Sequence, residues 1–304
     1  MRWNKFFYET ITSTRFGVFR TLFYSFCFLA WPMTWRPPLA TLSHEVFTPR
    51  ILFGLVDIEA VPSFASLDLA LGVSLAFSAA GLLNRTSRLV SAILGLYIFG
   101  VKYNYFPVHQ SESAMVIALV FFAVAPRGYN FSVDRLVSAM FARNVHYLER
   151  DVEVWPIRLM QLIFVFVFCS AGIMKIRTNF HEWATENMVG RTILLSKPGY
   201  MNEGSHWPMG LVNATDSVRT FLVSHSHLGH ALSVVVVLLE ILAPLMFIKK
   251  VRLPLAIALV GALVAFRVLM SHSFVFTFAP LALSFFVLDP TLPFQNFIAR
   301  IRKV

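Results

Sequence analysis

The feature that most limits the fold of this chain is a series of apolar runs, each of about 17 to 21 residues. A helix rises 1.5 Å per residue, so a run of about 20 residues crosses the roughly 30 Å hydrocarbon core of a bilayer. Hydrophobic residues make up 57% of the 304 residues and charged residues only 14%, whereas a soluble chain carries roughly 25% charged residues. The sequence therefore predicts an all-α fold, a polytopic integral membrane bundle of about eight transmembrane helices with membrane lipid as a partner.

The length and hydropathy of the runs place the predicted spans along the chain. They are residues 16–35, 66–84, 89–106, 112–126, 155–174, 228–248, 253–270 and 273–289. Only Ser271, His272 and Ser273 separate the last pair, which is therefore two spans, one broken helix or a re-entrant hairpin. We treat residues 1–304 as a single transmembrane domain, with long outer loops at 36–65 and 175–227 and a long inner connection at 127–154.

The basic residues indicate the orientation of the bundle. The formal net charge is +10, but these residues are scattered through short loops and form no basic stripe, so we expect no nucleic-acid partner. Placing the N-terminus inside puts most loop Lys and Arg on the cytoplasmic side, as the positive-inside rule requires. We therefore expect residues 1–15 to be a retained cytoplasmic segment, both termini to be cytoplasmic, and the chain to lie in a plasma or inner membrane.

Two ionisable residues, one near the middle of a predicted span and one at the end of another, are the main candidates for chemistry, because a charge inside a bilayer is costly. Glu240 lies near mid-span, so it must be protonated, paired or next to a hydrated cavity; its alternative role is an ion pair that ties two helices together. Lys175 follows Ser170, Ala171 and Gly172, small residues that let a helix or a flat ligand approach closely. Burial disfavours the ammonium form, so Lys175 can act as a general base, or it can snorkel to the outer interface.

Other polar residues have weaker signals. Arg267 lies near the outer end of its span, and Arg20 and Arg158 lie near inner ends, so we expect all three to snorkel. Arg267 can also reach toward Glu240, although their depths differ by roughly two helical turns, about 10 Å. His109 opens the fourth span on the outer side, where a solvated histidine is the ordinary interpretation.

Histidine and cysteine patterns give no metal site. Three histidines, at positions 225, 227 and 230, occur in SHSHLGH, and two of them share a helix face. No paired carboxylate joins them, and Cys27 and Cys169 lie in different apolar runs. We therefore predict no bound metal and no disulfide.

Several segments together resemble a known membrane family. The most specific is WPIRLMQLIFVFVFCSAGIMK, which ends at Lys175 and is followed by Trp183. The others, in chain order, are FGVFRTLFYSF with Arg20, AFSAAGLLNRTSRL, NFSVD, LLEILAPL with Glu240, and FRVLMSHSFVFTFAP with Arg267 and His272. Over nearly its full length the chain resembles the horizontally transferred transmembrane (HTTM) family, the transmembrane domain of vitamin K-dependent gamma-carboxylases and of many bacterial proteins.

The resemblance implies a role for these residues. In the carboxylase, the lysine after Ala-Gly deprotonates vitamin K hydroquinone, and oxygenation then yields a base strong enough to deprotonate a substrate glutamate. Lys175 occupies that position, with Glu240, Arg267 and His109 as catalytic partners. Gly172, Trp183 and His272 are then cofactor-binding residues for vitamin K hydroquinone or menaquinone, with a peptide or protein substrate on the outer face.

Departures from the family pattern keep a second function open. Arg267 stands where the carboxylase pattern has His, and His109 fits only with a register shift of two residues from Ser111. The 304 residues also contain no counterpart of the large lumenal region that binds protein substrates, so we do not expect a full protein carboxylase. The alternative is a non-catalytic membrane accessory protein for maturation, export or immunity of a secreted peptide. A secondary transporter is less favoured, because internal repeats are not evident.

Overall fold

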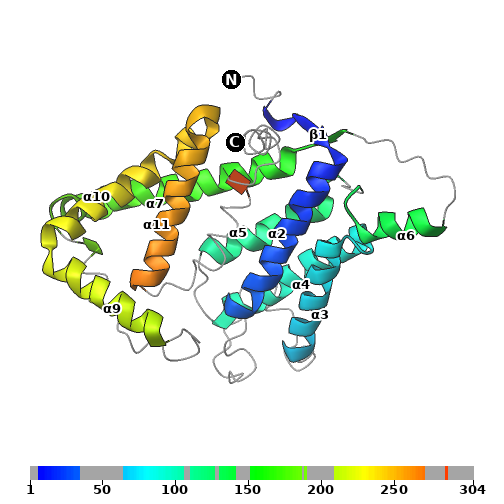
Figure 1. Cartoon of the computed structure of the whole chain (residues 1–304), viewed down its shortest axis with the longest axis horizontal. Helices are drawn as coiled ribbons and strands as arrows, with labels where there is room; N and C mark the ends of the chain where they lie inside the picture. The colour runs from blue at the N-terminus through cyan, green and yellow to red at the C-terminus, as the bar shows by residue number, and fades with distance from the viewer. Residues whose placement is uncertain are drawn as a thin grey trace, which may run out of the picture. The chain divides into compact units, whose positions relative to one another are not determined.

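Helices dominate the structure of the chain. The computed structural model describes residues 6–34, 64–105, 110–126, 130–141, 151–186, 188–189, 209–270 and 285–286, most of them helical (Figure 1). It divides into two compact units, Met1–Gln161 with Phe276–Val304, and Leu162–Val275. One long helix, α7 (Trp155–Thr185), contributes its first turns to unit 1 and the rest to unit 2. The all-α prediction is confirmed for the part of the chain that the structure describes.

Unit 1 consists of helices that coincide with the first four predicted spans. Their bounds are α2 (Ser13–Thr34), α3 (Phe64–Ala80), α4 (Asn84–Tyr105) and α5 (Gln110–Val124). A short helix, α6 (Val133–Phe141), lies in the connection predicted at 127–154. Neighbours in this series pack against one another, α2 with α3, α3 with α4, and α4 with α5.

A tight turn joins α3 to α4. Gly81 has φ of 71°, a left-handed conformation that glycine adopts without strain. A Cβ at this position would lie 2.5 Å from Ser132 Cβ and 2.6 Å from Arg20 Nη2. The turn therefore needs glycine both for its backbone conformation and for the space around it.

Serine hydroxyls connect the facing sides of α3 and α4. The Ser78 and Ser91 Oγ atoms are 3.2 Å apart, and Ser91 Oγ also lies 3.0 Å from Ser74 Oγ. All three serines are buried. Small polar residues at helix contacts let backbones approach closely, a pattern that is typical of helices packed in lipid.

The core of unit 1 is aromatic. Phe16, Phe19 and Phe23 on α2 contact Phe122 of α5, and the Phe23 and Phe122 rings stack with centroids 4.5 Å apart. Phe285 packs against the same rings, with its centroid 5.5 Å from that of Phe19. The recurrence of phenylalanine at positions 16, 19 and 23 places these side chains on one face of α2.

Two short strands precede α2 and α7. Strand β1 (Thr10–Thr12) pairs antiparallel with β2 (Asp151–Glu153), with Ile11 opposite Val152. The segment 1–15 and the connection 127–154 were expected to be only an N-terminal extension and a loop, so this pairing was missed. Three-residue strands are too short for their alternation to stand out in a sequence.

Unit 2 contains the rest of α7 and three further helices. These are α9 (Met209–Ser224), α10 (Ser226–Ile241) and α11 (Lys249–Met270), with a 3-10 turn, η5 (Ala243–Phe247), before α11. The predicted loop 175–227 is therefore partly helical, because α7 continues to Thr185 and α9 fills its end. Within the predicted span 228–248, the α-helix ends at Ile241, because Pro244 has no amide hydrogen to continue the helical hydrogen bonds.

Only part of the predicted membrane topology can be read from helix lengths. Among the described residues, Trp155–Arg177 is long and apolar enough by itself to cross a bilayer. Ser217–Ser224 and Ser226–Ile241 qualify only as a pair, with a bend of 97° between them, and Ser66–Ala80 and Ser113–Val124 are apolar but shorter. The eight-span arrangement thus stays a prediction, and its last span, 273–289, falls almost entirely outside the described residues.

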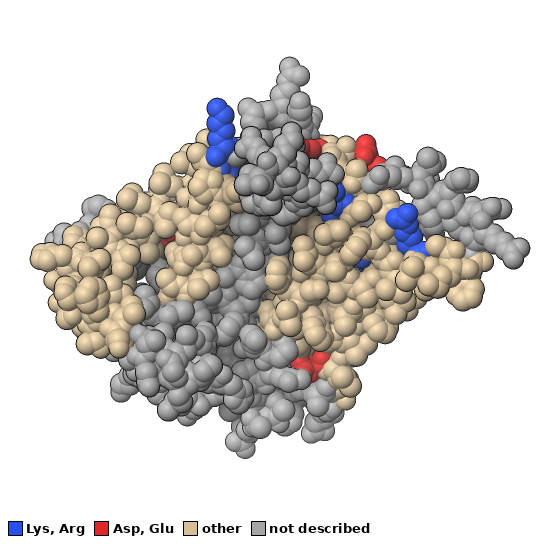
Figure 2. Space-filling model, viewed as in Figure 1, with Lys and Arg blue, Asp and Glu red and all other residues tan. Residues whose placement is uncertain are grey.

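The surface carries many large apolar side chains. Leu69 on α3 is 69% exposed, and Phe166 on α7 and Ile257 on α11 are also exposed. Few charged side chains lie among the described residues on the face shown in Figure 2. At the same time, Arg20, Arg88, Arg158 and Arg252 are buried. Buried arginines together with many exposed large apolar side chains are unusual in a water-soluble protein.

Candidate functional site

The candidate site in unit 2 forms where α7 crosses α10. Gly172 and Lys175 are three residues apart on α7, so they share a helix face. Glu240 lies in the last turn of α10 before Pro244 ends the helix. The sequence thus brings a small residue, a base and an acid to one helix crossing.

Gly172 determines how closely the two helices approach. A Cβ added there would lie 3.0 Å from Glu240 Cβ, 3.0 Å from Ile241 Cγ1 and 3.1 Å from the Ile241 amide nitrogen. Of the two expected neighbours of this small residue, a helix or a flat ligand, the helix takes up the space. The role of Gly172 in cofactor binding therefore stays a prediction, and its observed contact is with α10.

Lys175 and Glu240 form an ion pair across this crossing. Lys175 Nζ donates to both carboxylate oxygens of Glu240. Glu240 is therefore paired, which is one of the three states that the sequence allowed. Lys175 does not snorkel away from the bundle, because its ammonium group has a carboxylate partner within unit 2.

The pair is mostly enclosed but remains accessible from one side. The side chain of Glu240 is 11% exposed, and that of Lys175 is 22% exposed. On α7, Met174 and Ile176 are the neighbours of Lys175 on either side and are exposed, so the helix surface around the exposed part of the pair is apolar. A proton-exchanging pair at an apolar surface can serve a lipophilic molecule with an acidic hydroxyl, because the molecule's body and its hydroxyl then both find suitable contacts.

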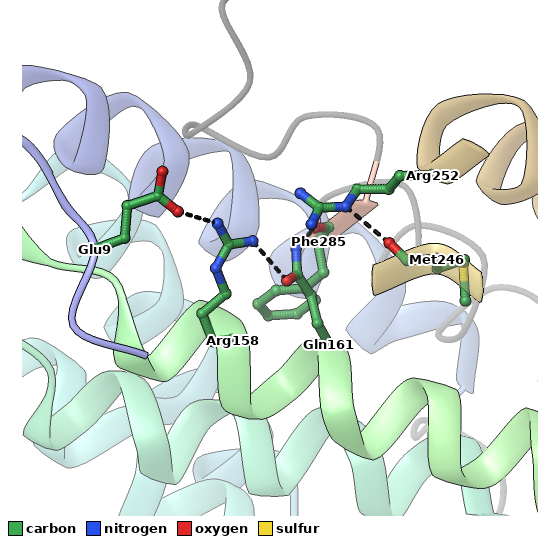
Figure 3. Close-up of polar contacts among 6 residues, drawn as sticks. All are labelled: Glu9, Arg158, Gln161, Met246, Arg252 and Phe285. Carbon is green, nitrogen blue, oxygen red and sulfur yellow. Dashed lines mark hydrogen bonds and ion pairs between the residues drawn. The ribbon is translucent and has the colours of Figure 1, made fainter. Parts of the chain in front are cut away.

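A second polar cluster on α7 lies in unit 1, where the Arg158 side chain is buried and its partner Glu9 is partly exposed. Arg158 Nη2 donates to Glu9 Oε2 at 2.6 Å, and Arg158 Nη1 donates to Gln161 Oε1 at 2.8 Å (Figure 3). Gln161 Nε2 in turn donates to the Phe285 carbonyl at 2.6 Å. The Arg158 guanidinium also lies 4.8 Å from the centroid of the Phe6 ring. We refer to Glu9, Arg158, Gln161 and the Phe285 carbonyl as the Arg158 network.

The expectation that Arg158 and Arg20 snorkel is wrong. Both side chains are buried, and Arg20 Nη2 donates to the Phe131 carbonyl at 2.5 Å. Each guanidinium finds oxygen acceptors inside unit 1, so neither has to reach the interface. The i, i+3 spacing of Arg158 and Gln161 was the available signal, because such residues meet on one face of a helix. Glu9 gave no signal, since its contact depends on the pairing of β1 with β2.

The other predicted site residues are not brought together by the described structure. Arg267 lies within α11 and Trp183 within α7, but the directions of their side chains are not described. His109 and His272 lie outside the described residues. Their roles stay predictions.

The histidine cluster at the start of α10 has a local explanation. The His225 ring stacks on Phe221 with centroids 4.1 Å apart, and its Nδ1 lies 2.9 Å from the Phe221 carbonyl oxygen. His225 therefore stabilises the bend at which α9 ends and α10 begins.

No family model, curated protein or solved structure matches the chain.

Proposed function

We propose that the chain is a polytopic membrane protein of the HTTM type. The supporting observation is the combination of exposed apolar side chains on the helices with buried serines and arginines between them. Such a surface is favourable in lipid, because exposure of apolar side chains to lipid has no free-energy cost. Internal hydrogen bonds are also favoured there, because no water competes for the polar groups. In this proposal α2 to α5, α7, α10, α11 and the predicted span 273–289 cross or enter a plasma or inner membrane, with both termini cytoplasmic.

Membrane crossing can be tested by washing and by sided labelling. We expect alkaline carbonate to leave the chain in the membrane pellet and detergent to release it. Cysteines introduced by Arg85→Cys, in the first turn of α4, and by Leu55→Cys should react with an impermeant maleimide from opposite sides. Release by carbonate, or labelling of both from the same side, would contradict the proposal.

We further propose that the Lys175–Glu240 pair is a proton-transfer centre for a quinone-type lipophilic cofactor. The single observation that supports this function is the partly open ion pair in apolar surroundings. In such a pair the carboxylate can take the ammonium proton, which leaves a neutral amine beside a neutral acid and removes two costly buried charges. The amine lone pair of Lys175 then accepts a proton from a hydroxyl placed against it.

The cofactor class follows from the resemblance and from the position of the opening. Vitamin K hydroquinone or menaquinol would supply the acidic hydroxyl and the oxygen-dependent redox chemistry, and Lys175 and Glu240 would hold and move the proton. A flat ring would contact Met174 or Ile176, which are exposed on either side of Lys175, while the Gly172 side of α7 is covered by α10. A peptide or protein on the outer face is the proposed final substrate.

A specific observation favours the second candidate, a non-catalytic accessory protein for a secreted peptide. Gly172 and the Lys175–Glu240 pair together account for how α7 is held to α10, with no chemistry required. In that case Lys175 and Glu240 stabilise the bundle, and removal of either affects folding alone.

The deciding experiment compares binding and oxidation in detergent-solubilised protein. Reduced vitamin K and menaquinone are titrated into the wild type, Lys175→Ala and the control Lys250→Ala, which removes an exposed lysine of α11. We expect saturable binding by all three and loss of hydroquinone oxidation in Lys175→Ala alone. Absence of binding by the wild type, or unchanged oxidation in Lys175→Ala, would favour the accessory role.

A further inference from the structure

Helix α6 has an apolar face that nothing in the described structure covers. Its apolar residues recur at positions 133, 136, 137, 140 and 141, the spacing of one helix face. All nine residues of α6 are described and none is buried. Phe141 is 84% exposed and Met140 is 68% exposed, and Leu136 and Val137 are exposed beside them.

Polar contacts attach α6 to the end of the α3–α4 hairpin. The Asp134 carboxylate accepts hydrogen bonds from the Leu83 and Asn84 amides, at 2.8 and 2.9 Å, so it caps the start of α4. Just before α6, the Phe131 carbonyl accepts the hydrogen bond from Arg20. If α3 and α4 cross the membrane, the turn between them lies at the membrane surface, and α6 is held at the same depth.

Packing against the protein does not explain why α6 is a helix. A cavity of about 440 Å³ lies beside it, lined by residues that include Thr21, Ala80, Phe131 and Leu136. A helix of nine residues is marginal in water, because nucleation is costly and few hydrogen bonds follow. Its stability must come largely from burial of the apolar face in another medium.

The charges around α6 fit the headgroups of acidic lipids. Arg85 is exposed in the first turn of α4, next to the turn that Asp134 caps, and Arg135 lies on α6 with its guanidinium donating to the Asn130 carbonyl at 2.8 Å. Amphipathic helices with cationic flanks lie in the interface with their apolar face about 5 to 10 Å below the headgroups. Each basic side chain near an anionic surface adds to this attraction.

We infer that α6 is an interfacial helix that inserts Leu136, Val137, Met140 and Phe141 into the acyl boundary of the cytoplasmic leaflet, with Arg85 and Arg135 among acidic headgroups. The occupant of the apolar face is the lipid bilayer itself. The inference rests on the proposed membrane location of the chain. It adds a membrane-surface element to the spans, in a connection predicted to be a cytoplasmic loop.

The test measures the depth of single spin labels in the full chain, with Cys27 and Cys169 replaced by alanine. The protein is reconstituted in vesicles of phosphatidylcholine and phosphatidylglycerol at three to one. Labels are attached after Val137→Cys and Met140→Cys on the apolar face, and after Ser138→Cys on the other face. Leu69→Cys on α3 reports a predicted span, and Phe141→Cys provides a second position if Met140→Cys folds poorly.

Collisions with oxygen and with a water-soluble nickel chelate distinguish the outcomes. We expect the oxygen-to-nickel ratio at positions 137 and 140 to exceed that at 138 several-fold and to approach that at 69. High nickel accessibility at all α6 positions, with position 69 in lipid, would overturn the inference and leave the membrane proposal standing. Low accessibility to both reagents at 137 and 140 would show that residues 142–150 or a second copy cover the face, and would also overturn it. Nickel access at position 69 would instead mean that the membrane proposal fails.

Discussion

Helix α7 carries two polar clusters that differ in how fully the protein encloses their cations. In the Arg158 network, the guanidinium is 1% exposed, and the Gln161 amide continues the hydrogen bonds to a backbone carbonyl. In the Lys175–Glu240 pair, both charges are side chains, and Lys175 is 22% exposed. In the Arg158 network only the Glu9 carboxylate, which is 31% exposed, can be reached from outside, and its arginine partner cannot release a proton. Lys175 is partly exposed and can exchange a proton with a bound molecule.

The comparison of these two clusters shows how polar residues within apolar helices can be divided into those with a structural role and those that are candidates for chemistry. Cost alone does not separate them, because both clusters bury charge in apolar surroundings. Access to the cation from outside separates them, as does the ability of that cation to release a proton. By these criteria Arg158 stabilises unit 1, and Lys175 remains the candidate for chemistry.

The largest expected effect comes from opening the Arg158 network. Arg158→Met removes the donor to the buried Gln161 amide oxygen and to the partly exposed Glu9 carboxylate, so we expect a loss of about 3 kcal/mol in unfolding free energy, the lower end for a broken buried pair. Denaturant unfolding in detergent measures it. The control Arg177→Met removes an exposed arginine from the same helix and should change stability by less than about 0.5 kcal/mol. Equal effects of the two variants would contradict the structural role of Arg158.

A smaller effect should follow from breaking the Lys175–Glu240 pair. Lys175→Met leaves the Glu240 carboxylate mostly buried without its donor, at an expected cost of about 1 to 3 kcal/mol, reduced by the partial exposure. The double variant Lys175→Met/Glu240→Met removes both charges and should recover most of that loss. If the pair is chemical, oxidation of hydroquinone stays lost in the double variant although stability returns. Recovery of both stability and hydroquinone oxidation in the double variant would show that the pair has only a structural role.

The close approach at Gly172 gives a comparable or smaller effect. Gly172→Val places a branched side chain where even a Cβ lies 3.0 Å from Glu240, so we expect a loss of about 1 to 3 kcal/mol by overpacking. Gly261→Val, on α11, meets nothing within 4 Å of its Cβ and should change stability by less than about 0.5 kcal/mol. Thermal unfolding of the two variants side by side measures the difference. A neutral Gly172→Val would mean that α7 and α10 do not approach as closely as described.

The smallest expected effect sets a reference for ordinary hydrogen bonds between these helices. Ser91→Ala removes a hydroxyl shared with Ser74 and Ser78, and such bonds in membrane proteins average about 0.6 kcal/mol. The same unfolding assay measures it. A loss as large as that of Arg158→Met would remove the distinction between a charged network and a neutral hydroxyl contact.

The sequence predicted the helices better than their contacts. Apolar runs located α2 to α5, α7, α10 and α11, because burial in any medium requires such runs. The pairing of Lys175 with Glu240 could only be raised as one of several states, because sequence does not show which helices are neighbours. The capping of α4 by Asp134 depends on a contact between residues 50 positions apart, and no local pattern indicates it. Arg20 and Arg158 were misjudged partly for the same reason, since the Phe131 carbonyl and Glu9 lie far away in the chain, although Gln161 is close to Arg158 in sequence.

The hydrogen bond from Arg20 to the Phe131 carbonyl has a consequence for the order in which the protein is made. The two residues are 111 positions apart, so at a synthesis rate of 5 to 20 residues per second the arginine precedes its acceptor by about 6 to 22 s. During that interval α2 carries a cation that the finished molecule satisfies internally. If α2 crosses the membrane as proposed, a nascent chain that ends before residue 131 presents the insertion machinery with a first span whose arginine lacks this acceptor. If synthesis is arrested at successive chain lengths, we expect α2 to reach its final position only in chains long enough for α6 to have left the ribosome.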